Sequence, residues 1–365
     1  MANENLHKAK EDKNDEFYTQ YSDIQNEINA YLDYDPDVFR DKVVLLPCDD
    51  PEWSNFTKFF AQNFEILGLK KLISTSYAIN SKKDKYHLEY ERTLFEMCSD
   101  EYDEEISDAR GKIFILEKDK NNSGKINVDD LEWHYLEGDG DFRSDEVKTL
   151  LDEADFVVTN PPFSLFRPFV AWLVEANKKF LIIGSQNAIT YKEIFPLLKD
   201  NLMWLGNGFS GGNAFFSLPK NTETSYVDGV FDTNTGLVKF RNCCWFTNID
   251  HGRRHQPLSL MTMADNLKFS KHKDVLENGY QKYDNYDAIN VSYTDAIPSD
   301  YEGYMGVPVT FMDKYCPEQF EIVGLIAGNI KGLAGIPTST GKDGPYIDGK
   351  LKYGRILIRK KVDTK

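Results

Sequence analysis

The first 250 residues alternate between apolar runs and amphipathic stretches. Residues 43–47 (VVLLP) and 69–75 (LKKLIST) have the short apolar character of buried strands. Between them, residues 54–64 (SNFTKFFAQNF) place apolar side chains at helical spacing behind a Ser that can cap a helix. This order predicts a strand, a helix and a second strand.

The same alternation continues along the chain. Three more strands and two further strand candidates are predicted, at 132–142 (EWHYLEGDGDF), 154–163 (ADFVVTNPPF), 178–189 (KKFLIIGSQNAI), 201–207 (NLMWLGN) and 243–250 (CCWFTNID). Helices are predicted between them, at 144–154 (SDEVKTLLDEA) and 165–176 (LFRPFVAWLVEA). Strands that alternate with helices predict an α/β fold with an open, mostly parallel sheet, which binds ligands at the carboxyl ends of its strands.

Two regions depart from this alternation. Residues 80–135 are polar and rich in tyrosine and charge, which favours an inserted region that carries a hairpin. Beyond residue 250 the chain has charged clusters and a tail rich in Tyr, Pro and Gly, without helical periodicity. We therefore expect a first domain over residues 1–250 and a second module with long loops over residues 251–365. The length of 365 residues fits one large domain with a smaller one appended.

The composition is that of a globular protein, with 41% apolar and 28% charged residues. No apolar run of about 18 residues predicts a membrane span, and the polar N-terminus lacks the apolar centre of a signal peptide. We therefore expect a cytoplasmic protein without a membrane partner. The formal net charge of −16 argues at first sight against a nucleic-acid partner. That argument is weak, because nucleic-acid binding depends on a local basic face.

Metal binding finds little support in the sequence. The five cysteines have no CxxC spacing, and we expect them to be core residues rather than ligands or disulfide partners. Residues 119–130 (DKNNSGKINVDD) resemble a calcium-binding loop, but Asp130 stands where a bidentate Glu is usual. The preceding KIFILEK has the pattern of a strand, so we interpret NNSGK as a hairpin turn and predict no metal site.

A candidate catalytic motif ends the apolar run at 154–163 and consists of Asn160, Pro161, Pro162 and Phe163. The Asn160 amide oxygen and the Pro161 carbonyl can each accept one N–H bond of an exocyclic amine, which directs the nitrogen lone pair toward a methyl donor. The prolines stiffen the loop, and the Phe163 ring can stack on a planar base. The simpler interpretation is a strand end followed by a helix start, where Pro-Pro is common.

Other candidate residues lie near the ends of predicted strands. Asp141 can accept a hydrogen bond from an adenine amino group and Phe142 can stack on its ring, although a Gly-rich turn with an Asp cap is the simpler interpretation. Asp49 and Asp50 can hold the ammonium group of an amino acid. The Thr19 hydroxyl precedes the first strand and can approach a carboxylate. The Gly-rich phosphate loop of dinucleotide sites is missing, which argues against NAD.

Basic side chains gather beyond residue 250. They are Arg253, Arg254, His255, Lys268, Lys271, His272 and Lys273, with Arg359, Lys360 and Lys361 near the end of the chain. Their position after the predicted sheet favours phosphate contacts for at least some of them, although a solvated face is the usual role of such clusters. Chemistry on a base in a duplex requires flipping that base into a pocket. Phe209, Phe215 and Phe216 are candidates for its walls, with core packing as the alternative.

In their order along the chain, these motifs resemble the γ-type N6-adenine DNA methyltransferases, and more narrowly the EcoRI-type adenine-specific methyltransferases. The resemblance covers most of the chain, through HKAKEDKNDEFYTQY, GDGDFRS, TNPPFSLFR, KKFLIIG, ITYKE, YDNYDAIN and MGVP. It implies a Rossmann-like methyltransferase sheet, with residues 251–365 as target-recognition region, and methyl transfer from S-adenosylmethionine to N6 of adenine in double-stranded DNA. The target base is assigned to residues 160–163, the cofactor adenine to Asp141 and Phe142, and the cofactor methionine end to Thr19.

This chain departs in two places from the wider methyltransferase pattern. The stretch around Asp49 and Asp50 lacks the FxGxG glycines, and LISTSYAI lacks the acidic residue that commonly holds the cofactor ribose, so we assign no ribose ligand. The resemblance implies double-stranded DNA as partner and allows a cognate restriction endonuclease in a restriction-modification system. Two alternatives remain, a methyltransferase for RNA or protein glutamine and a catalytically silent DNA-binding homologue.

Overall fold

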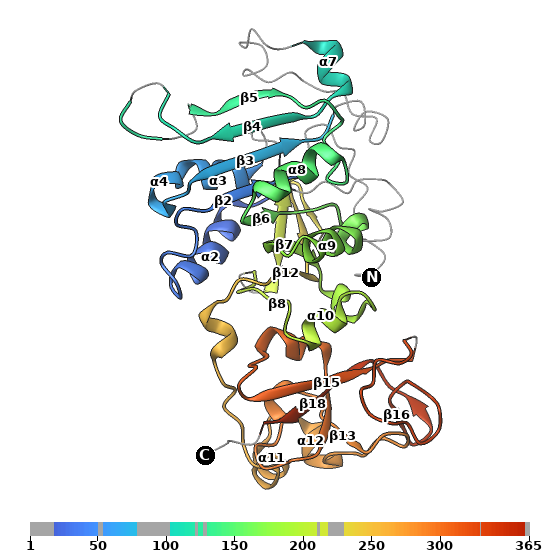
Figure 1. The fold of residues 1–365 in the computed structure, drawn as a ribbon. Helices are drawn as coiled ribbons and strands as arrows, with labels where there is room; N and C mark the ends of the chain where they lie inside the picture. The colour runs from blue at the N-terminus through green and yellow to red at the C-terminus, as the bar shows by residue number, and fades with distance from the viewer. Residues whose placement is uncertain are drawn as a thin grey trace. The chain divides into compact units, whose positions relative to one another are not determined.

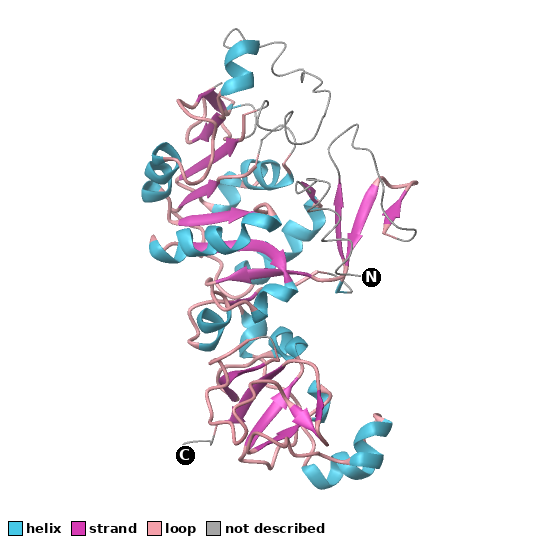
Figure 2. Cartoon of the chain, turned by 90° about the vertical axis from the view of Figure 1, so that its right-hand side faces the viewer, coloured by secondary structure: helices cyan, strands magenta, loops and turns pink. Residues whose placement is uncertain are grey.

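The computed structural model describes residues 18–49, 54–78, 103–120, 123–126, 130–209, 212–217, 230–328 and 330–361. The chain forms two compact units (Figures 1 and 2). The first unit takes residues 1–186 and 206–250, and the second takes residues 187–205 and 251–365. Residues 187–205, which the sequence pattern places in the first domain, therefore belong to the second unit.

The first unit is built around a mixed β-sheet. Seven of its strands lie in the order β5-β4-β3-β2-β6-β7-β12. Their bounds are Glu132–Tyr135 (β5), Lys112–Leu116 (β4), Lys71–Ser76 (β3), Val43–Leu46 (β2), Phe156–Thr159 (β6), Lys179–Ser185 (β7) and Cys243–Thr247 (β12). β2 pairs in parallel with β3 and β6, and β6 pairs in parallel with β7. The pairs β3–β4, β4–β5 and β7–β12 are antiparallel.

The α/β class predicted from the sequence is confirmed, whereas the prediction of a mostly parallel sheet is wrong. Three of these six pairings are antiparallel, because β4 and β5 extend the sheet as a hairpin and β12 returns alongside β7. The hairpin expected within 80–135 is thus part of the main sheet, and residues 79–102 lie outside the described residues. Apolar runs show that a strand is buried but not its direction, which the connections decide.

Helices lie on both sides of the main sheet, as the cyan and magenta elements of Figure 2 show. The helices of the first unit are α2 (Tyr21–Leu32), α3 (Asn55–Gln62), α4 (Phe64–Leu67), α7 (Glu104–Ala109), α8 (Asp145–Glu153) and α9 (Phe166–Glu175), with the short 3-10 helix η2 (Phe163–Leu165). The Ser predicted to cap the first helix is confirmed, because the Ser54 hydroxyl accepts from Phe56 N at 3.0 Å. Ser144 caps α8 in the same way, through Val147 N at 3.2 Å.

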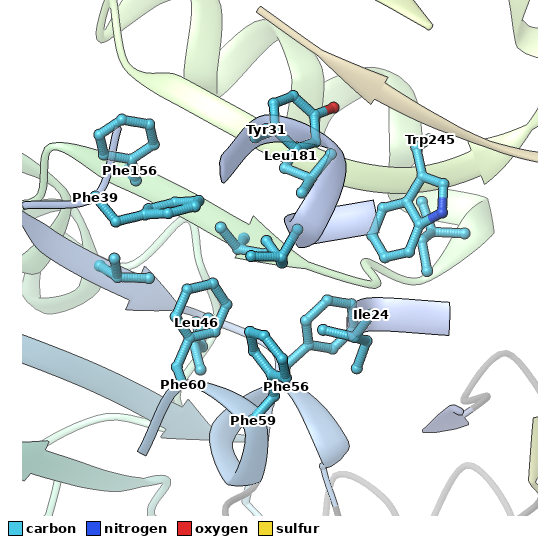
Figure 3. Close-up of a cluster of buried hydrophobic side chains, with 14 of the residues drawn as sticks. Ile24, Tyr31, Phe39, Leu46, Phe56, Phe59, Phe60, Phe156, Leu181 and Trp245 are labelled. Atoms are coloured by element: carbon cyan, nitrogen blue, oxygen red, sulfur yellow. The ribbon is translucent and has the colours of Figure 1, made fainter. Parts of the chain in front are cut away.

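An aromatic-rich core fixes α2 and α3 on the sheet. Figure 3 shows Ile24 of α2 and Phe56 of α3 in the same cluster as Leu46, Leu181 and Trp245 of β2, β7 and β12. All five side chains are buried. Burial of large apolar side chains is the main driving force of folding, at about 25 cal/mol per Å² of apolar surface. The amphipathic pattern of residues 54–64 thus places α3 directly beside the end of β2.

The packing of α9 on the sheet depends on a glycine. The Phe166 ring of α9 lies 5.0 Å from the Phe246 ring of β12, centroid to centroid. A Cβ added to Gly184 of β7 would lie 2.3 Å from the Phe166 ring. Only glycine therefore allows this close approach of helix and strand.

A second, smaller antiparallel sheet of the first unit has the order β1-β9-β11-β10. Its strands are Tyr18–Thr19 (β1), Ala214–Ser217 (β9), Leu237–Phe240 (β11) and Phe231–Asp232 (β10). Thr19 pairs with Phe216 in the β1–β9 ladder. This pairing gives residues 18–21 of the N-terminal FYTQY stretch a fixed position, and Phe17 lies outside the described part of the chain.

The second unit has its own sheet, in the order β13-β14-β18-β15, and a separate β16–β17 hairpin. Its elements are η3 (Gln186–Thr190), α10 (Phe195–Lys199), β8 (Trp204–Leu205), η5 (Gly252–His255), α11 (Met263–Phe269), α12 (Lys273–Asn278), β13 (Ala288–Asn290), η6 (Thr294–Ala296), β14 (Tyr304–Val307), η7 (Val309–Lys314), β15 (Phe320–Ile326), β16 (Tyr346–Ile347), β17 (Lys350–Leu351) and β18 (Arg355–Lys360). The sequence pattern did not predict this sheet or its helices. Helices of six and seven residues are too short to show helical periodicity.

Among the described residues, the chain has no helix with both the length and the apolar character needed to cross a bilayer.

Candidate active site

The Asn160–Phe163 motif directly follows the carboxyl end of β6. Asn160 is partly buried and Pro161 is buried. Phe163 begins η2, and its ring lies 6.3 Å from the Phe240 ring, centroid to centroid, at an interplanar angle of 84°. The strand therefore ends at Thr159, and the motif forms the link between β6 and α9 at the ligand-binding edge expected for parallel strands.

Asp49 connects this motif to the end of β2. Its carboxylate accepts from the Ser54 hydroxyl at 2.6 Å and from the Thr159 hydroxyl at 2.5 Å, and the residue is only 5% exposed. The Asp49 backbone carbonyl accepts from the hydroxyls of Thr57 and Ser74. The carboxyl ends of β2, β3 and β6 are thus joined through one residue.

Thr19 is brought to the same place from the N-terminal side. Its carbonyl accepts from the Asn55 amide nitrogen at 2.7 Å, and Asn55 follows Ser54 at the start of α3. Thr19 is 2% exposed, and its hydroxyl oxygen is buried without a hydrogen-bond partner in the described part of the chain. A buried polar atom of this kind calls for a partner such as a ligand. Thr19, Asp49 and Asn160 are therefore brought together, whereas Asp50 lies outside the described residues.

The GDGDF turn packs against the end of β3. Ala78 N donates to the Asp139 carbonyl at 2.9 Å. Gly140 has φ of +85°, and a Cβ added there would lie 2.3 Å from the Ser76 carbonyl oxygen. Only glycine fits both the left-handed backbone and the close contact. Residues 138–142 are thereby held beside the carboxyl end of β3, at the same edge of the sheet as Asp49.

Asp141 is held as an ionised acceptor. Arg143 donates to its carboxylate from Nε at 2.8 Å and from Nη2 at 2.5 Å. These bonds lower the pKa of Asp141 below its ordinary value. The neighbouring Tyr77 follows β3, and burial raises the pKa of its phenol to about 12, with the carboxylates of Asp139 and Asp141 adding to the shift. Tyr77 and Arg143 were missed in the sequence, because no local pattern shows that β3 and the GDGDF turn meet.

Phe142 is 5% exposed and packs in the core. Its ring lies 5.0 Å from Phe169 and 5.3 Å from Trp172, both in α9. The Arg143 guanidinium lies 5.6 Å from the centroid of the Phe142 ring. This packing fixes the backbone beside Asp141, and stacking of Phe142 on an adenine stays a prediction.

The Gly-rich stretch around residue 210 contributes mainly to the core. Phe209 and Phe216 are buried, and the Phe209 ring stacks on Trp245 at 5.5 Å. Phe215 points to the other face of β9 and is 38% exposed. Of the three aromatic residues considered as pocket walls, only Phe215 thus has substantial exposed surface in this structure.

Two adjacent basic residues predicted to contact DNA, Arg254 and His255, have partners within the second unit. Arg254 is 8% exposed, stacks 3.7 Å from the Trp204 ring and donates to Asn201 at 2.5 Å. His255 pairs with Glu318 at 2.9 Å. Such an environment favours a packing role for Arg254.

The remaining basic residues differ in their partners. Lys271 pairs with Asp295 at 2.7 Å, and His272 bonds to the same carboxylate. The Lys268 ammonium lies 4.8 Å from the Phe269 ring. Of the residues predicted to contact DNA, Arg253, Lys268 and Lys273 form no ion pair and no side-chain hydrogen bond within the described residues.

The described residues contain no group of three or more His, Cys, Asp or Glu side chains that could hold a metal ion. In the stretch that resembles a calcium loop, Asp119 accepts from Ser123 N at 3.1 Å and from Gly124 N at 2.7 Å. Its preceding segment is strand β4 and not a helix. Side-chain bonds of this type stabilise a turn.

The chain is similar to known proteins over nearly all of its length. A family described as "Adenine-specific methyltransferase EcoRI" matches residues 5–361. The chain is 43% identical to the Type II methyltransferase M.EcoRI of Escherichia coli, over 99% of this chain and 97% of that protein. It is 34% identical to the Type II methyltransferase M.MpnI of Mycoplasma pneumoniae, over 98% of this chain and 99% of that protein. No solved structure gives a significant match.

Replacing Thr159 with Val keeps the side-chain volume but leaves the buried Asp49 carboxylate without one donor. We expect the free energy of unfolding to fall by about 1.5–3 kcal/mol, the usual value of a hydrogen bond to a charged group. Thr149→Val, on the exposed face of α8, is the control and should change it by less than about 0.5 kcal/mol. Urea unfolding measures both, and an equal effect of the two substitutions would show that the bond contributes nothing.

Proposed function

This chain belongs to the family of EcoRI-type adenine-specific methyltransferases and is a site-specific adenine DNA methyltransferase; from that premise we propose that it transfers a methyl group from S-adenosylmethionine to N6 of adenine in double-stranded DNA. The observation that carries this proposal is the position of Asn160–Phe163. The motif leaves the carboxyl end of β6 immediately after Thr159, whose hydroxyl bonds to Asp49 at the end of β2. A target-base motif and a candidate cofactor strand are thus joined directly.

The residues around Asp49 fit S-adenosylmethionine, which supplies an activated methyl group on a sulfonium centre. The buried Thr19 hydroxyl, which has no partner in the described part of the chain, and the buried carboxylate of Asp49 suit the amino-acid end. Asp50 is the further candidate for the ammonium group. Asp141, kept ionised by Arg143, is an acceptor for the adenine amino group, and Phe142 is the candidate for stacking on that ring.

In the proposed reaction, Asn160 and Pro161 act on the target adenine. The Asn160 amide oxygen and the Pro161 carbonyl each accept one N–H bond of the exocyclic amine, while Phe163 stacks on the base. Pro162 keeps the loop stiff between them. These contacts orient the nitrogen lone pair toward the methyl group, so positioning and electrostatics replace a strong general base. Reaching them from a duplex requires the adenine to flip out of the base stack.

We propose that the second unit contacts the duplex. A restriction-modification system, with a cognate restriction endonuclease and a cytoplasmic location, is a further expectation. Arg253, Lys268 and Lys273 remain candidates for phosphate contacts. For Arg254, His255 and Lys271 this role requires exchanging an existing partner for a phosphate.

Replacing Asn160 with Ala removes one of the two acceptors for the target amine and leaves Pro161 and Phe163 in place. We expect single-turnover methyl transfer to a duplex oligonucleotide to slow by about 10²–10³, the loss typical of a preorganised acceptor or donor in an active site. Affinities for cofactor and DNA should stay near those of the wild type.

The exposed Asn278 provides a matched control, because Asn278→Ala removes an amide at the end of α12. It should transfer methyl groups at the wild-type rate. If Asn160→Ala also does so, the motif is only a strand end. If instead Asn160→Ala loses all binding, Asn160 has a structural role.

Replacing Asp141 with Ala removes the acceptor proposed for the cofactor adenine, and we expect affinity for S-adenosylmethionine to fall about 10–100-fold. The pKa of Asp141 is lowered, so its contribution is present above its ordinary pKa and is lost only as pH falls through the lowered value. The difference between wild type and variant should therefore stay constant from about pH 8 to about pH 5.

Isothermal titration calorimetry at several pH values measures this difference. Asp145→Ala, which removes an exposed carboxylate in the first turn of α8, is the control and should leave the affinity unchanged. If wild type and Asp141→Ala bind S-adenosylmethionine with equal affinity, the assignment of Asp141 to the cofactor site is wrong.

A further inference from the structure

Positive charge is concentrated at one end of this acidic chain. Residues 331–361 contain eight Lys or Arg and two Asp, a net charge of +6. The whole chain has a formal net charge of −16, so the other residues together carry −22. A polyanion is repelled by a surface of that sign unless a local basic region opposes it. The last strands of the second unit are therefore the strongest candidate for a phosphate-binding surface.

Within this segment, residues 338–353 form a loop followed by a hairpin. We call the loop and the hairpin together the C-terminal arm. Its strands β16 and β17 pair antiparallel, and Asp348 and Gly349 form the two-residue turn with φ of 51° and 71°. Positive φ at both positions is characteristic of a type I′ hairpin. Figure 1 labels β16 at the right-hand side of the second unit.

Asn285, in the YDNYDAIN stretch, anchors the base of the C-terminal arm. Its side chain is 1% exposed, and its amide nitrogen donates to the carbonyls of Lys342 at 2.7 Å and Gly344 at 2.8 Å. Its amide oxygen accepts from Tyr346 N at 3.3 Å. One buried amide thus satisfies three backbone groups of the arm, which fixes the course of a loop that has little apolar surface of its own.

The neighbours of Asn285 hold the rest of the arm. The Asp284 carboxylate accepts from Asp348 N at 3.2 Å and from Gly349 N at 2.8 Å, at the hairpin turn. The Tyr286 hydroxyl donates to the Asp343 carbonyl at 3.0 Å. Because both the loop and the turn are held by this stretch, the arm presents its side chains from a defined backbone.

The exposed side chains of the arm include three lysines and one aromatic ring, together with the carboxylate of Asp348 at the turn and Leu351. Lys342, Lys350 and Lys352 are exposed and form no ion pair within the described residues. The Lys342 ammonium lies 4.8 Å from the Tyr346 ring. Tyr353 is 88% exposed. This differs from Lys271, whose positive charge is offset by the Asp295 carboxylate.

We infer that the C-terminal arm binds the phosphate backbone of duplex DNA through Lys342, Lys350 and Lys352. The inference rests on the proposed function, which makes DNA the substrate. Charge complementarity favours a phosphate backbone over an acidic protein, because the arm combines unpaired lysines with the exposed Tyr353, and both side chains are common phosphate donors. Phosphate contacts carry no base information, so the arm contributes affinity and not sequence choice.

The test replaces Lys350 and Lys352 with Ala in the full chain. Fluorescence anisotropy with a duplex oligonucleotide at several salt concentrations gives the slope of log affinity against log salt. We expect this slope to become less steep by about 1.8, because each lost phosphate contact contributes about 0.9. The loss of affinity should be the same for specific and unrelated duplexes.

Lys199→Ala with Lys282→Ala is the matched control. Both lysines are exposed and belong to the second unit, and they already pair with Asp200 and Asp287. The control should keep the wild-type slope. S-adenosylmethionine affinity, measured on the same preparations, should be unchanged in both double variants. If Ala lowers it, the substitutions Lys350→Gln and Lys352→Gln keep most of the side-chain length and test the same charges.

The outcomes separate this inference from the proposed function. A wild-type chain that neither binds nor methylates duplex DNA would overturn the proposed function. A wild-type chain that methylates DNA, beside a Lys350/Lys352 variant with the wild-type salt slope, would overturn the role of the arm alone. A shallower slope in that variant and not in the control supports the arm as a phosphate-binding surface.

Discussion

A buried carboxylate at the end of β2 is the constraint on which the candidate active site depends. Burial of an ionised group is unfavourable unless hydrogen bonds replace its hydration. Asp49 obtains these from Ser54, the cap of α3, and from Thr159, the residue before Asn160. The requirement to satisfy one buried carboxylate therefore fixes the start of α3 and the start of the NPPF motif at the same point. The cofactor side and the target-base side of the proposed site are built from one hydrogen-bond network.

Local patterns predicted the individual elements of this network, but they did not predict that these elements contact one another in the fold. The apolar run at 43–47, the capped helix at 54–64 and the strand before Asn160 follow from periodicity and turn residues, and the structure confirms them. The bond between Asp49 and Thr159 joins residues 110 positions apart, and no local pattern shows such a contact. The same limit explains the wrong prediction of a mostly parallel sheet, since strand direction depends on which distant strands pair.

Charge shows a similar limit in the second unit. The sequence shows that Arg253, Arg254 and His255 are adjacent, but it cannot show that Arg254 is buried against Trp204 while His255 pairs with a carboxylate. A count of lysines does not distinguish these residues from the unpaired cations of the C-terminal arm. Partners decide whether a positive charge is available to a phosphate. The YDNYDAIN stretch, which the sequence marks only by resemblance, acquires a physical role as the anchor of that arm.

A double-mutant cycle on methyl transfer tests most directly whether the Asp49–Thr159 bond couples the two sides of the site. Single-turnover rates would be measured for wild type, Asp49→Asn, Thr159→Val and the double variant, at saturating cofactor and DNA. If the bond acts as one unit, the double variant is hardly slower than the slower single variant, with a coupling energy of about 1 kcal/mol or more. Rate losses that simply multiply would show that the two residues act independently and would contradict the account.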